Sequence, residues 1–101
     1  MLFMMVATHS PESCPAFNPK YRTITKNWAA NAEAINKKYG IKTVGMWTDH
    51  GAHTIYGVFD APNIEAVMGS FMEPVMHASL EYQTIRMFPI LTMEETMKLI
   101  P

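Results

Sequence analysis

The stretch IKTVGMWTDHGAHTIYGVF, residues 41–59, decides the fold because it holds two apolar, β-branched and aromatic segments on either side of a two-residue turn. Such segments favour strands, and Gly51-Ala52 between them fits a type II′ hairpin turn. In this register, one side of the hairpin carries the pairs His50–His53, Thr48–Ile55, Met46–Gly57 and Val44–Phe59. The other side carries the pairs Asp49–Thr54, Trp47–Tyr56 and Gly45–Val58. Both sides are therefore rich in apolar or aromatic residues.

A strand and a long helix are expected before the hairpin. Residues 2–8 form a short apolar segment that is typical of a strand, and the prolines in residues 10–18 indicate a loop. Asn18 followed by Pro19 is typical of a helix start, and Gly40 of a helix end. Between them, apolar residues recur every three or four positions, at Tyr21, Ile24, Trp28, Ala32, Ile35 and Tyr39. This spacing predicts an amphipathic helix.

A helix, a strand and a short terminal helix are expected after the hairpin. Apolar residues at helical spacing run over residues 64–75, and Pro74 is expected to kink or restart this helix. Residues 80–87 alternate loosely and predict a strand that ends before Pro89. The sequence Thr92-Met93-Glu94-Glu95 has the spacing of a capping box, which predicts a short C-terminal helix.

The expected order of elements is strand, helix, strand, strand, helix, strand, followed by the short terminal helix. This is the split βαβ arrangement of an α+β protein, and a chain of 101 residues suits one such domain over residues 1–101. The arrangement predicts a four-stranded antiparallel sheet in the spatial order 4-1-3-2, with two helices on one face.

The composition indicates that this sheet needs a partner. Charged residues make up only 17% of the chain, 49% of it is hydrophobic, and ten residues are methionine. Two helices cover one face of the sheet, and a solvated second face should be polar. The first strand instead puts Leu2, Met4 and Val6 on one face and Phe3, Met5 and Ala7 on the other. We therefore expect a homodimer, or a higher assembly of dimers, that packs sheet against sheet; the alternative is that the C-terminal helix covers this face.

Charge and cysteine content limit the classes of partner and compartment. Eight Lys and Arg balance nine Asp and Glu, for a net charge of −1, and Lys37-Lys38 is the only adjacent basic pair. This balance argues against binding to nucleic acid or to an anionic membrane surface. Cys14 is the only cysteine, and the apolar residues 2–7 are too short and lack the basic flank of a signal peptide or membrane span. A cytoplasmic location is the resulting expectation.

Three short segments resemble the dimeric α/β-barrel superfamily, and more narrowly its small, uncharacterised GYD-type members. They are Gly45-Met46-Trp47, Gly57-Val58-Phe59-Asp60 and Ala61-Pro62-Asn63. The resemblance extends from Leu2 to Ile100 and implies a ferredoxin-like fold and a homodimer. The superfamily includes cofactor-free monooxygenases, haem-degrading enzymes, muconolactone isomerases and ligand-binding regulatory domains, so the resemblance assigns no activity and no catalytic residue.

Three of the four histidines are expected at one end of the sheet. In the split βαβ order, the end of the first strand and the hairpin turn lie at the same edge, so His9 joins His50 and His53. Paired hairpin residues have Cβ atoms about 5 Å apart, which lets both imidazoles reach one ion. Imidazole suits Zn, Cu, Fe or Ni, and three protein ligands with an open position are typical of catalytic zinc. These histidines are a candidate transition-metal site; the alternative is that they are exposed turn and strand-end residues.

Two further residues have chemistry that the sequence leaves open. Cys14 lies in the loop after His9, where it is either an activated nucleophile beside a histidine or simply a reduced loop cysteine. His77 lies near the end of the second helix, and a helix histidine can ligate iron in haem-binding relatives, but nothing else here indicates a haem pocket. No Gly-rich phosphate loop and no close pair of carboxylates is evident.

A ligand pocket between the sheet and the helices is the other candidate site. The aromatic residues that could line it are Trp28, Trp47, Tyr56, Phe59 and Tyr82, although buried aromatic residues are often simply core. Three functions remain open: a small-molecule-binding protein or enzyme, a non-catalytic ligand sensor, and a structural oligomer. An enzyme requires a polar group with a perturbed environment in an accessible pocket, a sensor requires only the pocket, and a structural oligomer has a filled core.

Overall fold

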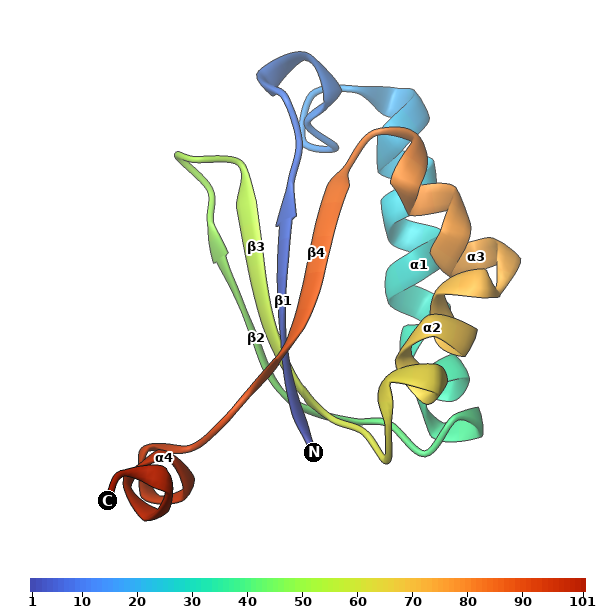
Figure 1. The fold of residues 1–101 in the computed structure, drawn as a ribbon. Coiled ribbons are helices and arrows are strands. Elements are labelled where there is room, and N and C mark those ends of the chain that lie inside the picture. Colours follow the sequence, from blue (N-terminus) through green and yellow to red (C-terminus); the bar gives the residue numbers. More distant parts are fainter.

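The computed structural model describes all residues, 1–101. Its elements in chain order are β1 (Leu2–Thr8), η1 (Pro11–Ser13), α1 (Pro19–Lys38), β2 (Lys42–Asp49), β3 (Thr54–Asp60), α2 (Ile64–Met72), α3 (Pro74–Ala78), η2 (Ser79–Glu81), β4 (Thr84–Ile90) and α4 (Met93–Leu99). The four strands form one antiparallel sheet in the order β2-β3-β1-β4, which is the predicted order read from the other edge. Helices α1, α2 and α3 lie together on one face of this sheet (Figure 1). The predicted ferredoxin-like α+β fold is confirmed.

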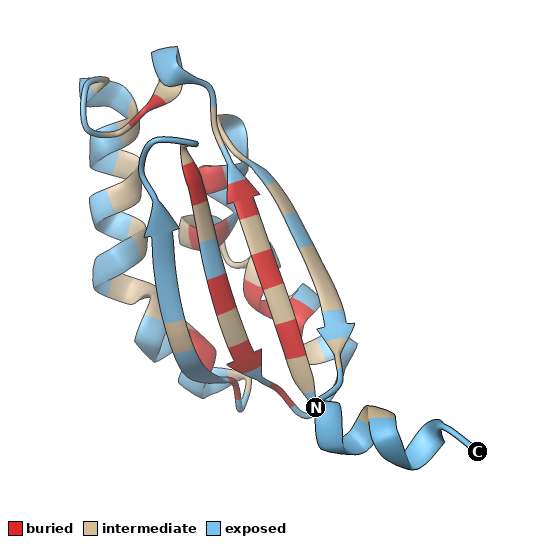
Figure 2. Cartoon of the chain, turned by 90° about the vertical axis from the view of Figure 1, so that its left-hand side faces the viewer, coloured by how far each residue is buried: buried red, intermediate tan, exposed pale blue.

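The hydrophobic core lies between the sheet and these helices. Phe3, Met5 and Ala7 on β1 are buried and face the helices, where they belong to one cluster with Ile41, Phe59, Ala61 and Val67. The residues between them on β1 are only half-buried, and Figure 2 shows this alternation along the strand. A strand places successive side chains on opposite faces, so the alternation separates the covered face of the sheet from an open face.

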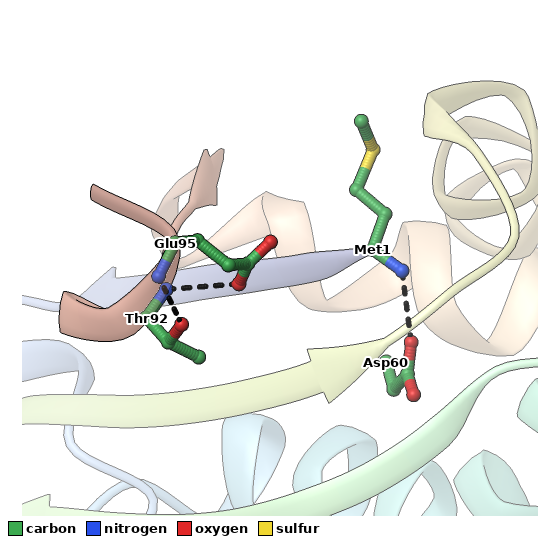
Figure 3. Close-up of polar contacts among 4 residues, drawn as sticks. All are labelled: Met1, Asp60, Thr92 and Glu95. Atoms are coloured by element: carbon green, nitrogen blue, oxygen red, sulfur yellow. Dashed lines mark hydrogen bonds and ion pairs between the residues drawn. The ribbon is translucent and has the colours of Figure 1, made fainter. Parts of the chain in front are cut away.

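Local sequence signals set the helix ends as predicted. The Asn18 side chain accepts a hydrogen bond from the backbone N–H of Lys20, and Gly40 after α1 has a φ of 71°, a conformation that glycine adopts without strain. Pro74 separates α2 from α3. The capping box at the start of α4 is complete, since Thr92 and Glu95 each bond the other's backbone N–H (Figure 3).

Three features of the sheet differ from the prediction: the bounds of the last strand, a bulge in β2 and the hairpin turn. The last strand covers Thr84–Ile90 rather than 80–87, because the preceding residues form η2. Pro89 therefore lies inside β4, where an edge strand tolerates its missing N–H. A bulge between Thr43 and Gly45 leaves Val44 unpaired, and Phe59 pairs with Thr43 instead of Val44.

The hairpin turn is the third difference. Gly51 does not have the positive φ that a type II′ turn requires, whereas His53 has a φ of 51°. The N–H of His53 donates to the carbonyl of His50 over 3.2 Å, and the N–H of Ala52 donates to the Asp49 carboxylate. The chain thus reverses over Gly51 and Ala52, and the left-handed residue follows them. The other predicted pairs along β2 and β3, from Gly45–Val58 to Asp49–Thr54, are confirmed.

The open face of the sheet and the C-terminal helix have no cover within the chain. Helix α4 projects away from the body of the protein, so it does not cover the sheet (Figures 1 and 2). The open face bears the apolar residues Leu2, Met4, Val6, Trp47, Tyr56, Val58, Phe88 and Ile90. At its edge, the N-terminal amine of Met1 pairs with Asp60 at 3.0 Å (Figure 3). None of the helices is long and apolar enough to cross a membrane.

Candidate functional site

A cavity of about 760 Å³ lies between the sheet and helices α1–α3. Its walls are mostly apolar and include Met5 and Phe59 from the sheet and Trp28 and Ala32 from α1. Ligand pockets in proteins typically have volumes of about 300–1,000 Å³, so this cavity has a suitable volume for a small organic molecule. This partly open space beside the packed core contrasts with the filled interior predicted for a purely structural oligomer.

A few polar groups line this cavity. Asn36 at the end of α1 is buried, and its backbone carbonyl accepts from the N–H of Ile41 at 2.8 Å. Lys37 and Lys42 are exposed and lie at the same wall, together with Glu33. An apolar interior with a small number of polar groups is the usual composition of a ligand site.

A second, smaller cavity of about 40 Å³ adjoins the first. Met5, Trp28 and Phe71 line both cavities, so these three side chains form the boundary between them. The small cavity also contains His9 and Tyr82. The chemistry-bearing residues of the chain are therefore separated from the large apolar cavity by a single layer of side chains.

His9, Cys14 and His53 form a cluster at this end of the sheet. One ligand atom from each residue lies within 4.8 Å of the other two. His9 follows β1, His53 precedes β3, and the N–H of His9 donates to the carbonyl of His53 over 3.2 Å, which extends the β1–β3 ladder by one pair. Their rings meet edge to face with centroids 5.2 Å apart. His9 points to the helix side of the sheet, because it continues the alternation of Phe3, Met5 and Ala7 and lines the small cavity together with Trp28.

A folded-back loop brings Cys14 to these histidines. Its N–H donates to the carbonyl of Pro11, and its own carbonyl accepts from the N–H groups of Phe17 and Asn18. The guanidinium of Arg22 on α1 binds the carbonyls of Pro15 and Ala16, and the side-chain amide of Asn18 binds the carbonyl of Glu12. These bonds fix the loop over the end of β1, and Cys14 is only 3% exposed.

The structure brings together His9 and His53, two of the three histidines predicted as a metal site. The third residue of the cluster is Cys14 instead of His50. His50 is exposed in the turn, its ring centroid is 6.1 Å from that of His53, and it is not in the cluster whose ligand atoms lie close together. His77 is exposed in the last turn of α3, away from this cluster. The proximity of Cys14 and His53 was missed, because residues 39 positions apart meet only once the loop is folded; the one sequence signal was the short, proline-flanked spacing from His9 to Cys14.

The electrostatics of this end of the sheet follow from burial and like charges. Burial lowers the pKa of the His9 imidazole below its ordinary value of 6.5, and the nearby His53 and His50 lower it further when they are protonated. Burial raises the pKa of the Tyr82 hydroxyl, although its hydrogen bond to Thr25 acts in the opposite direction and Cys14 raises it again when ionised. His9 is thus kept neutral and Tyr82 is kept protonated at neutral pH.

The predicted aromatic pocket residues divide between the two faces of the sheet. Trp28 and Phe59 line the large cavity, and Trp28 and Tyr82 line the small one. Trp47 and Tyr56 pair with each other on the open face, where they are 57% and 38% exposed. The division follows from the strand alternation, which puts Trp47 and Phe59 on opposite sides.

Comparison with known proteins identifies the fold. No family model matches the sequence, and no curated protein sequence matches it. A muconolactone isomerase structure aligns with a TM-score of 0.61 at 20% identity, over 91% of this chain and 90% of that one. An uncharacterised NIPSNAP domain protein from Burkholderia xenovorans aligns with a TM-score of 0.52 at 12% identity, over 91% and 96%. An antibiotic biosynthesis monooxygenase aligns with a TM-score of 0.50 at 10% identity, over 91% and 100%.

The chain shares the fold of these structures, which agrees with the predicted ferredoxin-like arrangement. They support the predicted resemblance to the dimeric α/β-barrel superfamily at the level of the fold alone. No family model supports the narrower resemblance to GYD-type members.

Proposed function

We propose that the protein binds a largely apolar small molecule in the cavity between the sheet and helices α1–α3, and that it acts on this molecule as an enzyme. The observation that carries the binding proposal is the open volume of about 760 Å³ inside a domain of only 101 residues. The cavity is partly open to solvent, so a ligand can enter it without unfolding the domain, and its mostly apolar walls favour an apolar molecule. The fold is shared with an isomerase and a monooxygenase, which is consistent with a small-molecule role.

The polar groups support an orientation for the ligand. The side-chain amide of Asn36 can donate and accept hydrogen bonds at the α1 wall of the cavity, which also carries Glu33 and Lys37. Lys37 and Lys42 favour an anionic or carbonyl group at that side. The apolar part of the ligand would then extend towards Trp28 and Phe71, behind which His9 and Tyr82 lie.

The enzymatic part of the proposal depends on those two residues. A neutral imidazole and a protonated phenol beside a ligand cavity can accept and donate a proton, respectively. A non-catalytic sensor would need only the large cavity. The two versions therefore differ in whether a bound molecule is chemically changed, and in whether His9→Gln affects that change without affecting binding.

We also propose that the working form is a homodimer in which two open sheet faces pack together. Eight apolar residues on this face lack a cover within the chain, among them Trp47 at 57% exposed. An apolar face of this kind is unusual on a monomer and typical of an interface. Two-fold symmetry is the simplest way for one chain to cover its own face.

The binding proposal can be tested with the fluorescent probe anilinonaphthalene sulfonate and a pair of matched variants on α1. Ala32→Phe places a ring in the cavity, whereas Ala30→Phe adds the same ring at an exposed position outside it. We expect Ala32→Phe to weaken probe binding by at least about tenfold, equivalent to about 1.4 kcal/mol. Ala30→Phe should leave binding unchanged, and circular dichroism should show that both variants are folded.

Equal binding by the two variants and the unmodified protein would contradict the proposal. The probe would then occupy another apolar surface, such as the open sheet face. Trp47→Glu identifies that outcome, because it places a charge on the open face and leaves the cavity lining intact.

A further inference from the structure

The cluster of His9, Cys14 and His53 has the ligand spacing of a metal site. Its three ligand atoms lie within 4.8 Å of one another. Around a tetrahedral zinc ion, with Zn–N of about 2.0–2.1 Å and Zn–S of about 2.3 Å, ligand atoms are about 3.3–3.8 Å apart. For an ion to bind, the three ligand atoms have to approach one another by up to about 1–1.5 Å from these separations.

Unpartnered nitrogen atoms are the second observation. Both ring nitrogens of His9 and Nδ1 of His53 are shielded from solvent and make no hydrogen bond. Buried polar atoms in folded proteins are nearly always satisfied, so these three require a partner that the chain does not provide. A metal ion between the imidazoles and the thiol would satisfy one nitrogen of each histidine. The remaining nitrogen of His9 would be available to a molecule in the small cavity, which His9 lines.

The backbone conformation around the cluster holds its three residues close together. His53 adopts a φ of 51°, a left-handed conformation that costs energy for a residue with a side chain and would suit glycine. A strained non-glycine residue is expected where the side chain is needed. The 3.2 Å bond from the N–H of His9 to the carbonyl of His53 joins the two histidines, and the Arg22 clamp holds the loop that carries Cys14.

The donor set defines the class of ion. Two imidazole nitrogens and one thiolate suit borderline and soft late first-row ions, and they do not suit Mg²⁺ or Ca²⁺, which take oxygen ligands. We propose that His9, Cys14 and His53 bind a transition-metal ion of the Zn²⁺ class, with a fourth coordination position open towards the small cavity.

Ligand binding in the large cavity does not involve this cluster, so the binding proposal and the metal site can each fail without the other. A His9 imidazole that binds a metal through one ring nitrogen carries a proton on the other, so the metal site and the use of His9 as a proton acceptor exclude each other. The metal site also replaces the three-histidine site expected from the sequence by one in which Cys14 takes the place of His50. Those two alternatives predict different effects of the same set of substitutions, which makes the choice between them measurable.

The test is a titration of the reduced, metal-free protein with Co²⁺, followed by competition with Zn²⁺. A cobalt ion bound to Cys14 gives a near-ultraviolet thiolate-to-metal charge-transfer band, which a site made only of histidines lacks. We expect saturation at one ion per chain, loss of the band in Cys14→Ala, and at least about tenfold weaker binding in His9→Ala and His53→Ala. Zn²⁺ should displace the cobalt and abolish the band.

Two exposed histidines supply matched controls. His50→Ala and His77→Ala remove the same side chain outside the cluster and should leave the affinity and the band unchanged. His53→Gly is the second variant at the strained position: glycine suits the left-handed backbone, so the protein remains folded while the ligand is lost.

Three results would overturn the site. They are the absence of a charge-transfer band in the unmodified protein, equal metal affinity in Cys14→Ala, and a loss of affinity in His50→Ala as large as that in His53→Ala. Rapid alkylation of Cys14 by iodoacetamide, unchanged by Zn²⁺, would likewise assign the cluster to a free thiol beside histidines.

Discussion

Both faces of the sheet carry many large apolar residues, but their surroundings are opposite. On the covered face, Phe3 is 1% exposed beneath the helices. On the open face, Trp47 and Tyr56 are large aromatic residues as well, but they are 57% and 38% exposed. The comparison shows that apolar content alone does not say which face is the core; the connections that bring α1–α3 to one side decide that. The open face has the residues of an interior without the cover, which is why we propose a homodimer.

The largest difference between the faces is expected from a matched pair of phenylalanines. Phe3→Ala on the covered face removes a fully buried ring and should lower the free energy of unfolding by about 3–5 kcal/mol. Phe88→Ala on the open face removes a half-buried ring and should cost less than half as much at low protein concentration. Denaturant unfolding at several concentrations measures both. Equal losses at low concentration would mean that the open face is already packed within one chain.

The second test places a charge on the open face. Trp47→Glu or Val58→Glu should weaken self-association by at least about 30-fold, or about 2 kcal/mol, because a buried charge would have no partner in the interface. Sedimentation or native mass spectrometry over a dilution series measures the dissociation. Ala30→Glu on the exposed side of α1 is the control and should have no effect. A dimer that tolerates both open-face substitutions would remove this face from the interface.

Two glycines provide a finer comparison of packing. A Cβ at Gly57 would lie 2.8 Å from the Phe59 ring on the covered face, and a Cβ at Gly45 would lie 2.5 Å from the Trp47 ring on the open face. We expect Gly57→Ala to cost about 1–3 kcal/mol, since the Phe59 ring is confined by the core. Gly45→Ala should cost less in the monomer, because the exposed Trp47 ring can rotate away. The opposite ranking in thermal unfolding would show that Trp47 is held more firmly than Phe59.

The smallest expected effect on stability concerns a contact between the helices that cover the sheet. Glu73, between α2 and α3, accepts hydrogen bonds from Lys38 at 2.6 Å and Tyr39 at 2.9 Å at the end of α1. The bond from Lys38 first, and that from Tyr39 second, lower the pKa of the Glu73 carboxyl below its ordinary value of 4.5. The unfolded chain therefore binds this proton more readily than the folded one.

It follows that the stability contributed by Glu73 is fully present above pH 4.5 and is lost as the pH falls through the lowered folded pKa. Glu73→Gln should lower the melting temperature slightly at pH 7, and this difference should disappear in acid. Glu12→Gln, at an exposed carboxylate without a side-chain partner, is the control and should show neither effect. A Glu73→Gln penalty that persists unchanged in acid would mean that the carboxylate charge plays no part in holding the helices.

Sequence by itself determined the elements that depend on neighbours a few residues away. The caps at Asn18 and Thr92, the break at Pro74 and most of the hairpin register follow from rules that act within one turn or one strand pair. The strand order follows from the split βαβ connections. The gathering of His9 and His53 at one edge could be predicted for the same reason, because strand direction fixes which ends meet.

Only the tertiary structure decided the contents of the candidate sites. Cys14 reaches the histidines because Arg22 clamps the loop from the next helix, a contact that no spacing rule encodes. The left-handed residue of the turn is His53, not the Gly51 that the turn type had predicted. This turn also accommodates the hydrogen bond from the Ala52 N–H to the Asp49 carboxylate and the bond from the His9 N–H to the His53 carbonyl. The bulge beside Val44 and the choice of face for Trp47 likewise depend on packing across the whole sheet. Long-range packing selects among local alternatives of similar energy, and at this end of the sheet it selected the residues that carry the chemistry.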